Sequence, residues 1–308
     1  MNMRAATRQS RLLAVALTFA FALLASSCAS GPQSITVTSV DRAIEPPPHG
    51  TKDYPQAFRA ILSVMLRNLQ LPPVEVSIIL FPSQTSYVEG VAADAERDLQ
   101  QLRKVLGPLA KNLRDEEFLA RARETALSTD AVGKHKRVLL NESRLAKHPW
   151  PEWMKVLAHE LAHSVEFALV EGRPALWDRW LTEGFAEWVG YKVLDLIGTE
   201  SFARSQEQRL GLMRAAKSFQ TFPSLSQLAA GSDFHTWART LGLEATYGQA
   251  LIAVDYLIEQ KGLAAVLEYF RLFRKSNNRE QNFTAAFGET PAAFDEKFSR
   301  RMTVLLGR

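Results

Sequence analysis

Apolar positions change their spacing along the chain, and the changes divide it into predicted elements. A helical repeat covers QAFRAILSVMLRNL (56–69), and β-branched apolar residues in VEVSIILF (74–81) predict a strand. Charge-rich sequence with helical spacing follows over 92–126, and RVLLN (137–141) predicts a second short strand. From Trp150 onward the spacing is almost entirely helical. The chain is therefore expected to be α+β and mostly helical, with a small N-terminal sheet and a helical C-terminal half.

One predicted helix of this half has clear ends and a broad apolar surface. Pro151 suits the first turn of a helix, Gly172 suits the residue after the last turn, and Pro174 prevents continuation. Its apolar residues are Met154, Leu157, Ala158, Leu161, Val165, Ala168 and Leu169. Because they surround much of the helix, we expect it to be largely buried, and polar residues on it then need partners. Further breaks fall at Pro223, at Gly231 and around 276–281.

The first 27 residues have the pattern of an export signal. Three arginines precede an apolar run, Leu12 to Leu24, which is too short to span a bilayer comfortably and is followed by small residues. The stretch LLASSC resembles a bacterial lipobox, which implies that Cys28 is lipidated and becomes the mature N-terminus. Ala29 at the next position then favours the outer membrane, with the protein on its periplasmic face. The alternative is a simple cleaved signal in which Cys28 has no role.

The remaining sequence divides into two parts. Residues 28–52 are polar and proline-rich and predict a tether, and residues 53–308 form the predicted domain. Within the domain, 92–130 is interpreted as a helical insertion, either a hairpin over the functional cleft or a longer scaffold.

Composition excludes several classes of protein. Cys28 is the one cysteine, so no disulfide or thiolate ligand is expected in the mature chain. Three of the 37 Lys and Arg residues lie in the signal, and the other 34 nearly balance 33 Asp and Glu residues. No basic segment with interleaved aromatic residues is present, so we expect no nucleic-acid partner.

The strongest chemical signal is LAHELAHSVEF (157–167). Residues four apart lie on one face of a helix, so His159 and His163 can direct ring nitrogens at a common metal ion. Glu160 lies next to them and could act as the general base on a metal-activated water. The alternative is a polar cluster with satisfied hydrogen bonds on a buried helix.

A third ligand is expected from the next helix. Glu166 and Leu169 occupy the positions where metzincins have glycine and histidine, which excludes that class. In WLTEGFAEW (180–188), Glu183 and Glu187 are four apart and share a helix face. The alternative, a solvated face, does not explain the aromatic residues around them.

Together these motifs resemble the gluzincin metallopeptidases, in particular the bacterial peptidase MA-like proteins. Their pattern is H-E-L-x-H followed by W-L-x-E-G-x-A-E, and nineteen residues separate His163 from Glu183. The resemblance extends with less specificity over 54–305. It implies a zincin-like fold, one Zn²⁺ ion per chain, Glu183 as third ligand and Glu187 as an acceptor that orients a ligand histidine.

A tyrosine follows the motifs in ATYGQALIAVDYL (245–257). Members of such families often carry Y-x-Q on a helix after the metal site, which implies that Tyr247 donates a hydrogen bond to the oxyanion formed during hydrolysis. The alternative is a tyrosine packed between helices.

These observations favour a zinc-dependent peptidase of the cell envelope, anchored to the membrane through Cys28, that acts on a peptide or protein substrate. A second hypothesis is a zinc-containing envelope assembly or binding factor with little general proteolysis, and a third is a structural lipoprotein without metal. The first two differ in whether the metal is open to a cleft that admits a peptide. No motif indicates the substrate, the choice between endo- and exopeptidase, or the oligomeric state.

Overall fold

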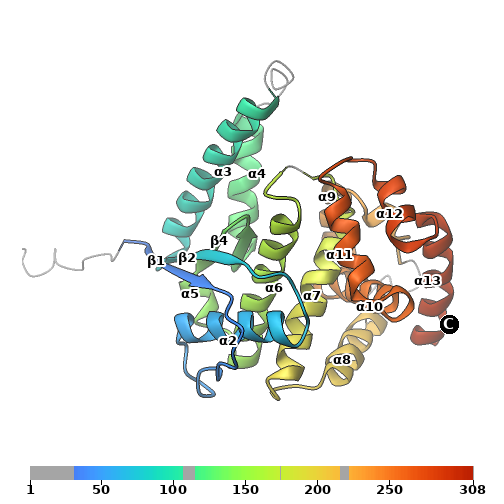
Figure 1. The fold of residues 1–308 in the computed structure, drawn as a ribbon, viewed down its shortest axis with the longest axis horizontal. Helices are drawn as coiled ribbons and strands as arrows, with labels where there is room; N and C mark the ends of the chain where they lie inside the picture. The colour runs from blue at the N-terminus through green and yellow to red at the C-terminus, as the bar shows by residue number, and fades with distance from the viewer. Residues whose placement is uncertain (1–30, 107–114, 174, 216–221, 308) are drawn as a thin grey trace, which may run out of the picture.

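The computed structural model describes residues 31–106, 115–173, 175–215 and 222–307. Its N-terminal part contains a four-stranded sheet in the order β1-β2-β4-β3, in which β2 and β4 are parallel and each edge strand is antiparallel to its neighbour (Figure 1). The strands are β1 (Gln33–Thr38), β2 (Glu75–Phe81), β3 (Ala131–Lys134) and β4 (Arg137–Asn141). The two predicted strands are thus confirmed as the two central ones.

Both faces of the sheet are buried. Side chains alternate along a strand, so Ile78 of β2 and Val138 of β4 enter the main core, whereas Ile79 and Leu139 face a smaller second cluster. The main core continues into the helices as far as Leu306. This explains why β2 and β4 are apolar at successive positions, unlike strands with one solvated face.

Strand β1 contradicts part of the predicted tether over 28–52. Residues 33–38 pair with β2, placing Ile35 opposite Ile78 and Val37 opposite Val76. The alternation of β-branched and polar residues in QSITVT is the pattern of an edge strand, and the neighbouring prolines and polar residues obscured it. The prediction is wrong for these residues, and the folded domain begins before residue 53.

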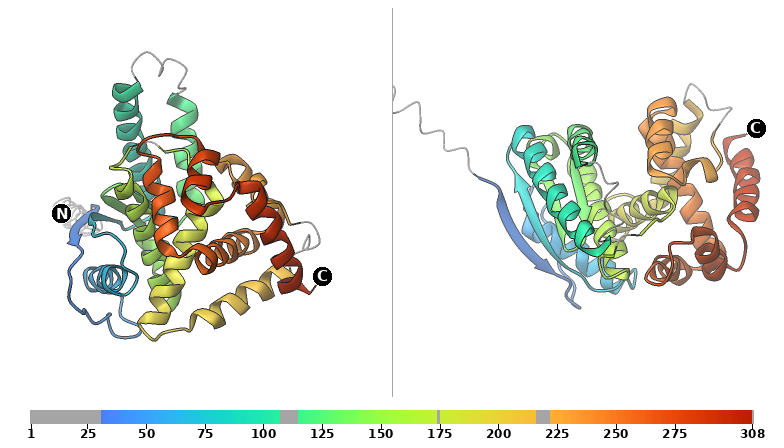
Figure 2. Two further views of the ribbon diagram at one scale, coloured as in Figure 1. Left: turned by 45° about the vertical axis from the view of Figure 1, so that its right-hand side comes forward. Right: turned by 90° about the horizontal axis from the view of Figure 1, so that it is seen from above.

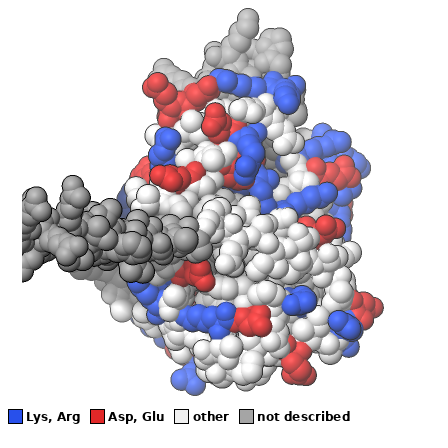
Figure 3. All heavy atoms as spheres, turned by 90° about the vertical axis from the view of Figure 1, so that its left-hand side faces the viewer, with Lys and Arg blue, Asp and Glu red and all other residues white. Residues whose placement is uncertain are grey.

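The charged segment forms a helical hairpin. Helix α3 (Gln84–Leu106) and helix α4 (Asp115–Ser128) pack side by side and project beyond the sheet (Figure 1). Acidic and basic side chains mix on the face shown in Figure 3. Within the hairpin, ion pairs join Arg103 to Asp115 and Arg121 to Glu117. The hairpin contacts the sheet through β2 and β4.

A buried ion-pair cluster fixes the hairpin to the sheet. Asp94 of α3 has a fully buried side chain and pairs with Arg137 Nε at 2.6 Å and with Lys134 Nζ at 2.7 Å. Although burial raises the pKa of Asp94, the hydrogen bonds from Arg137 and Lys134 lower it to about 2. The cluster joins α3 to β3 and β4 at once.

The rest of the domain is helical and packs against one face of the sheet and against itself (Figure 2). Around the sheet the elements are α2 (Tyr54–Arg67), α5 (Glu142–Leu145) and α6 (Trp150–Leu169). The C-terminal half contains α7 (Arg179–Leu196), α8 (Phe202–Ala215), the short 3₁₀ helix η3 (Ser226–Leu228), α9 (Gly231–Leu241), α10 (Leu243–Lys261), α11 (Leu263–Leu272), α12 (Arg279–Phe287) and α13 (Pro291–Leu306). The predicted α+β, mostly helical class is confirmed.

Two predictions about the membrane lie outside this description. The signal at 1–27 and Cys28 fall on residues that the structure does not describe. Among the described residues, no helix is long and apolar enough to cross a membrane.

We predict that Asp94→Asn lowers the free energy of unfolding by about 2 kcal/mol at pH 7, because it removes the charge that Arg137 and Lys134 face. Since the pKa of Asp94 is lowered in the folded state, its stabilisation is complete above about pH 4 and disappears as the pH falls toward 2. Urea unfolding at several pH values measures this. The control is Asp115→Asn, whose carboxylate is 42% exposed and paired with Arg103, and which should cost at most about 1 kcal/mol. Equal losses in both variants would contradict the prediction.

Candidate metal centre

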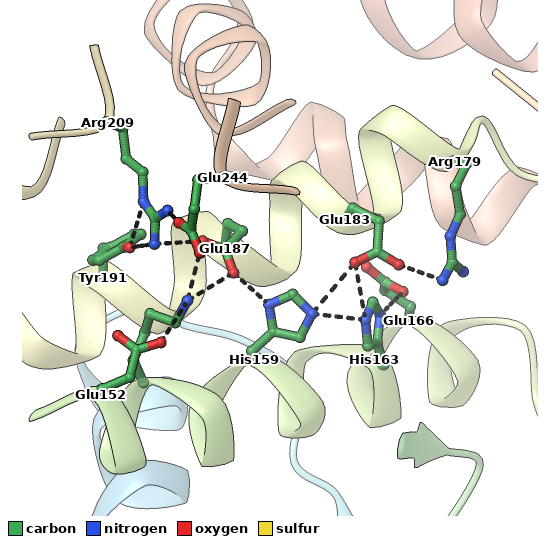
Figure 4. Close-up of polar contacts among 11 residues, drawn as sticks. Glu152, His159, His163, Glu166, Arg179, Glu183, Glu187, Tyr191, Arg209 and Glu244 are labelled. Carbon is green, nitrogen blue, oxygen red and sulfur yellow. Dashed lines mark hydrogen bonds and ion pairs between the residues drawn. The ribbon is translucent and has the colours of Figure 1, made fainter. Parts of the chain in front are cut away.

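Helices α6 and α7 pack against each other and carry both sequence motifs (Figure 4). Helix α6 begins at Trp150 with Pro151 in its first turn. It ends where Glu171 and Gly172 adopt positive φ angles of 56° and 70°, and the Gly172 N–H donates to the Phe167 carbonyl at 2.8 Å. The chain reverses after α6, so that α7 returns beside α6.

Glycines allow close contacts on both sides of this helix pair. A Cβ at Gly184 of α7 would lie 2.3 Å from the carbonyl oxygen of Ala250, so Gly184 lets α10 approach closely. A Cβ at Gly133 of β3 would lie 2.2 Å from the carbonyl oxygen of Glu160. Both distances are shorter than contacts that side chains tolerate, so these two glycines set how near β3 and α10 come to the motifs.

Three of the predicted residues converge at one point. Ligand atoms of His159, His163 and Glu183 all lie within 4.8 Å of one another, a group that can hold a metal ion. The two Nε2 atoms are 3.2 Å apart, and Glu183 Oε2 lies 3.4 Å from Nε2 of His159 and 3.9 Å from Nε2 of His163. The structure thus brings together the side chains that the sequence motifs paired (Figure 4).

The opposite nitrogen of each imidazole faces a carboxylate. His159 Nδ1 lies 3.0 Å from Glu187 Oε1, and His163 Nδ1 lies 2.9 Å from Glu166 Oε2. A carboxylate accepts, so each Nδ1 carries a proton and each Nε2 presents a lone pair. The two Nε2 atoms and the oxygen of Glu183 then point at one another, an arrangement that favours a cation, either a proton or a metal ion, between them.

The pKa values of the two histidines also indicate that the group attracts a cation. Burial lowers the pKa of His159, but hydrogen bonds with Glu183 and Glu187 outweigh it and raise that pKa to about 10. The pKa of His163 is also raised, by Glu166 and Glu183, against its burial. Without a metal ion the group attracts a proton, and a metal ion would replace it.

Glu166 belongs to the candidate site, and the sequence reasoning missed it. In the sequence it served to exclude the metzincin pattern. In the structure it is 1% exposed and accepts from His163, whereas its other oxygen, Oε1, has no partner among the described residues. Its spacing of three residues from His163 on an apolar helix is the signal that could have identified it.

Glu187, which accepts from His159, is held by two cations. Lys155 Nζ donates to Oε1 of Glu187 at 3.1 Å and to Oε2 at 3.3 Å. Nη2 of Arg209, on α8, lies 3.9 Å from Oε2 of Glu187. Arg209 also donates to the hydroxyl of Tyr191 and pairs with Glu244. Although burial raises the pKa of Glu187, the charge of Lys155 lowers it well below its usual range.

Glu183 is paired on its free side. Its Oε1 lies 2.5 Å from Nη2 of Arg179, one helical turn earlier on α7. Burial raises the pKa of Glu183, but the charge of Arg179 and the hydrogen bond with His159 lower it far below its ordinary value. Glu183 therefore stays ionised, with Oε1 directed at Arg179 and Oε2 directed at the two histidines.

Glu160 and Tyr247 both lie beside the metal group. Glu160 is 8% exposed and its Oε2 accepts a hydrogen bond from the backbone N–H of Gly133, so the edge strand β3 fixes its position. The ring of Tyr247 lies 6.3 Å from the ring of His159 and packs edge-on against Phe234 of α9. Among the described residues, the Tyr247 hydroxyl has no recorded hydrogen-bond partner.

The donor set suits zinc. Given Zn–ligand bonds of about 2.0–2.1 Å, neighbouring donors of a tetrahedral site lie roughly 3.3 Å apart, and two of the three separations here are 3.2 and 3.4 Å. Two imidazoles with fixed tautomers and one carboxylate leave one tetrahedral position for another ligand. The His159 and His163 side chains are 11% and 12% exposed, so the group is not closed to solvent.

A cavity lies away from the metal group. Its volume is about 720 Å³, and it is bordered by α12, α13 and the start of α7. Asp178 and Trp180 line it, but none of the metal-group residues does. The shape of the surface therefore does not by itself point to the metal group; the chemistry of the side chains does.

Comparison with protein-family models, curated proteins and solved structures finds no match. The resemblance to gluzincin peptidases consequently rests on the motifs and on the geometry described above.

We predict that Glu166→Ala weakens zinc binding by about 10- to 100-fold, because His163 loses the acceptor that fixes its tautomer and orientation. Competition with a chromophoric chelator at neutral pH measures the affinity. Glu259→Ala, on the exposed surface of α10, is the control and should bind zinc like the unmodified protein. Unchanged affinity in Glu166→Ala would show that His163 needs no such acceptor.

Proposed function

We propose that this protein is a zinc-dependent peptidase of the gluzincin type. The observation that carries the proposal is the convergence of Nε2 of His159, Nε2 of His163 and Oε2 of Glu183, with both imidazole tautomers fixed by carboxylates. Such a His₂Glu set is typical of catalytic zinc sites with one open position. A zinc ion held there supplies a Lewis acid that polarises a peptide carbonyl and makes water more acidic.

Glu160 has the role of general base in this proposal. Its Oε2 is held by the Gly133 N–H, which leaves Oε1 to take a proton from the attacking water and deliver it to the leaving amine. The Tyr247 hydroxyl is proposed to donate to the oxyanion, supported by its ring position beside His159. The raised pKa of Tyr247, caused first by burial and then by the charge of Glu183, keeps the hydroxyl protonated as a donor.

The arrangement of elements supports a zincin-like fold. Helix α6 packs against the sheet through β3 and β4, and the antiparallel edge strand β3 touches the general base through Gly133. The helical C-terminal half then supplies Glu183 from α7 and Tyr247 from α10. We expect substrate to bind between these two halves.

The proposed location is the cell envelope, with a lipid anchor on Cys28 at the periplasmic face of the outer membrane. Because β1 begins at Gln33, four residues would separate the anchor from the sheet. Five peptide units span at most about 17 Å. The domain would therefore lie close to the membrane rather than on a long tether.

One observation favours the second candidate, a zinc-containing assembly or binding factor. The metal-group side chains are mostly buried, and a cavity of about 720 Å³ lies away from them. The variant Glu160→Gln separates the two candidates.

We predict that Glu160→Gln retains about one zinc ion per chain and loses peptide hydrolysis by about 10²- to 10⁴-fold, because the amide cannot accept the proton. Elemental analysis and digestion of a peptide library by the purified chain measure the two properties. A zinc-loaded wild-type protein without hydrolysis would support the binding factor, and hydrolysis that persists in Glu160→Gln would exclude the proposed mechanism.

We predict that Tyr247→Phe lowers kcat by about 10²- to 10³-fold, with little change in KM or zinc content, because the lost hydrogen bond forms only as negative charge develops. The control is Tyr256→Phe on the same helix, which stacks on Phe294 away from the metal group and should retain kcat. A rise in KM alone would indicate that Tyr247 serves in substrate packing.

A further inference from the structure

One buried arginine of α8 connects helix α7 to helix α10. The side chain of Arg209 is 9% exposed, and its Nη2 lies 3.9 Å from Oε2 of Glu187 on α7. Its Nε donates to the hydroxyl of Tyr191, also on α7, at 2.7 Å. Its Nη1 pairs with Glu244 in the first turn of α10. Figure 4 shows the guanidinium of Arg209 among these three side chains.

The contacts with α7 place Arg209 one side chain away from a proposed metal ligand. Glu187 and Tyr191 are four residues apart, so they share one face of α7 and hold the guanidinium from the same side. Glu187 also accepts from His159 Nδ1 at 3.0 Å. A guanidinium has five N–H donors in a rigid plane, so it can bind these α7 residues and a carboxylate of another helix at the same time.

The contact with α10 lies where that helix begins. Gly242, directly before the helix, has a φ of 96°, and no side chain caps the helix there with a hydrogen bond among the described residues. Leu243 is 57% exposed and the Glu244 side chain is 56% exposed. The ion pair with Arg209 therefore attaches an otherwise solvated first turn to α8.

Helix α8 also lies directly against α10 beside Tyr247. A Cβ at Gly248, the next residue after Tyr247, would lie 3.2 Å from Sδ of Met213 and 3.6 Å from Cβ of Arg209. The first of these distances is shorter than most side-chain contacts, so the glycine allows α8 to approach at this point. Arg209 thus contacts α10 on both sides of Tyr247 in the sequence.

The position of the Tyr247 hydroxyl depends on where α10 lies. Tyr247 follows Glu244 by three residues, so the two are on adjacent positions of one helix face. Its ring lies 6.3 Å from the ring of His159 and packs edge-on against Phe234, whereas its hydroxyl has no recorded partner within the described part of the chain. A shift of α10 relative to α7 would therefore move this hydroxyl relative to the metal group.

We propose that Arg209 is a positioning residue of the peptidase: by joining Glu187 to Glu244, it sets the distance between the Tyr247 hydroxyl and the metal group. This inference rests on the proposed function and adds a residue that touches neither substrate nor metal. An ion pair with an exposed carboxylate contributes little to stability. A displacement of about 1 Å at a reacting group, however, can lower a rate by about 10²-fold, so the same contact can matter for catalysis.

The main test is Glu244→Gln, because this side chain is exposed and its replacement leaves Glu187 and Tyr191 unchanged. We expect kcat to fall by about 3- to 10-fold, with KM unchanged, since the oxyanion donor is displaced but the ground-state contacts remain. Zinc affinity, measured with a chromophoric chelator, should stay the same. A blocked phosphinic dipeptide, whose phosphinate imitates the oxyanion, should bind the zinc-loaded variant more weakly by the same factor in calorimetric titration.

A double-mutant cycle separates positioning from a general effect on the fold. In Tyr247→Phe there is no hydroxyl to place, so adding Glu244→Gln should change kcat and phosphinate binding by less than about twofold. Arg209→Lys keeps the charge but loses the planar fork, and it should lower kcat at least as much as Glu244→Gln. The matched control is Glu207→Gln, which removes the exposed partner of Arg214 on α8 and should retain kcat.

Two results would overturn this inference and leave the proposed function standing. One is an unchanged kcat in Glu244→Gln, and the other is an equal loss with and without the Tyr247 hydroxyl, which would mean that the ion pair serves only the fold. If the zinc-loaded wild-type chain neither hydrolyses peptides nor binds the phosphinic dipeptide, the proposed function fails, and the inference fails with it.

Discussion

The rest of the site depends on one electrostatic constraint: two imidazole lone pairs and one carboxylate oxygen face each other in a buried place. Such a group is unfavourable unless a cation lies among its members. The constraint accounts for the carboxylate on the far side of each histidine. It also explains the raised pKa of His159, since a proton is the cation available when no metal is bound.

The fixed cations around this group serve the carboxylates, not the histidines. Lys155 and Arg209 pair with Glu187, and Arg179 pairs with Glu183. Glu183 and Glu187 therefore stay ionised and held in place despite burial. These partners come from α6, α7 and α8, so the site also connects the helical half to the sheet, where β3 holds Glu160.

Local sequence patterns predicted the parts of the site that depend on local geometry. The spacing of His159 and His163 is a property of one helix, and strands β2 and β4 are continuous apolar runs. Strand β3 was missed because AVGK is short and contains glycine, and β1 because its neighbours are polar and rich in proline. The pairs Lys155–Glu187 and Arg209–Glu187 join residues 32 and 22 positions apart, and no periodic pattern relates them.

The charge balance of the site indicates which chemistry it favours. Glu160, Glu166, Glu183 and Glu187 contribute four negative charges when ionised, and the three cations Lys155, Arg179 and Arg209 nearly balance them; Glu152 and Glu244 are more exposed and screened by solvent. One proton makes the buried group neutral, whereas a divalent ion gives it a net positive charge. That excess charge would favour an anion at the open position, such as the oxyanion that the proposed hydrolysis would form.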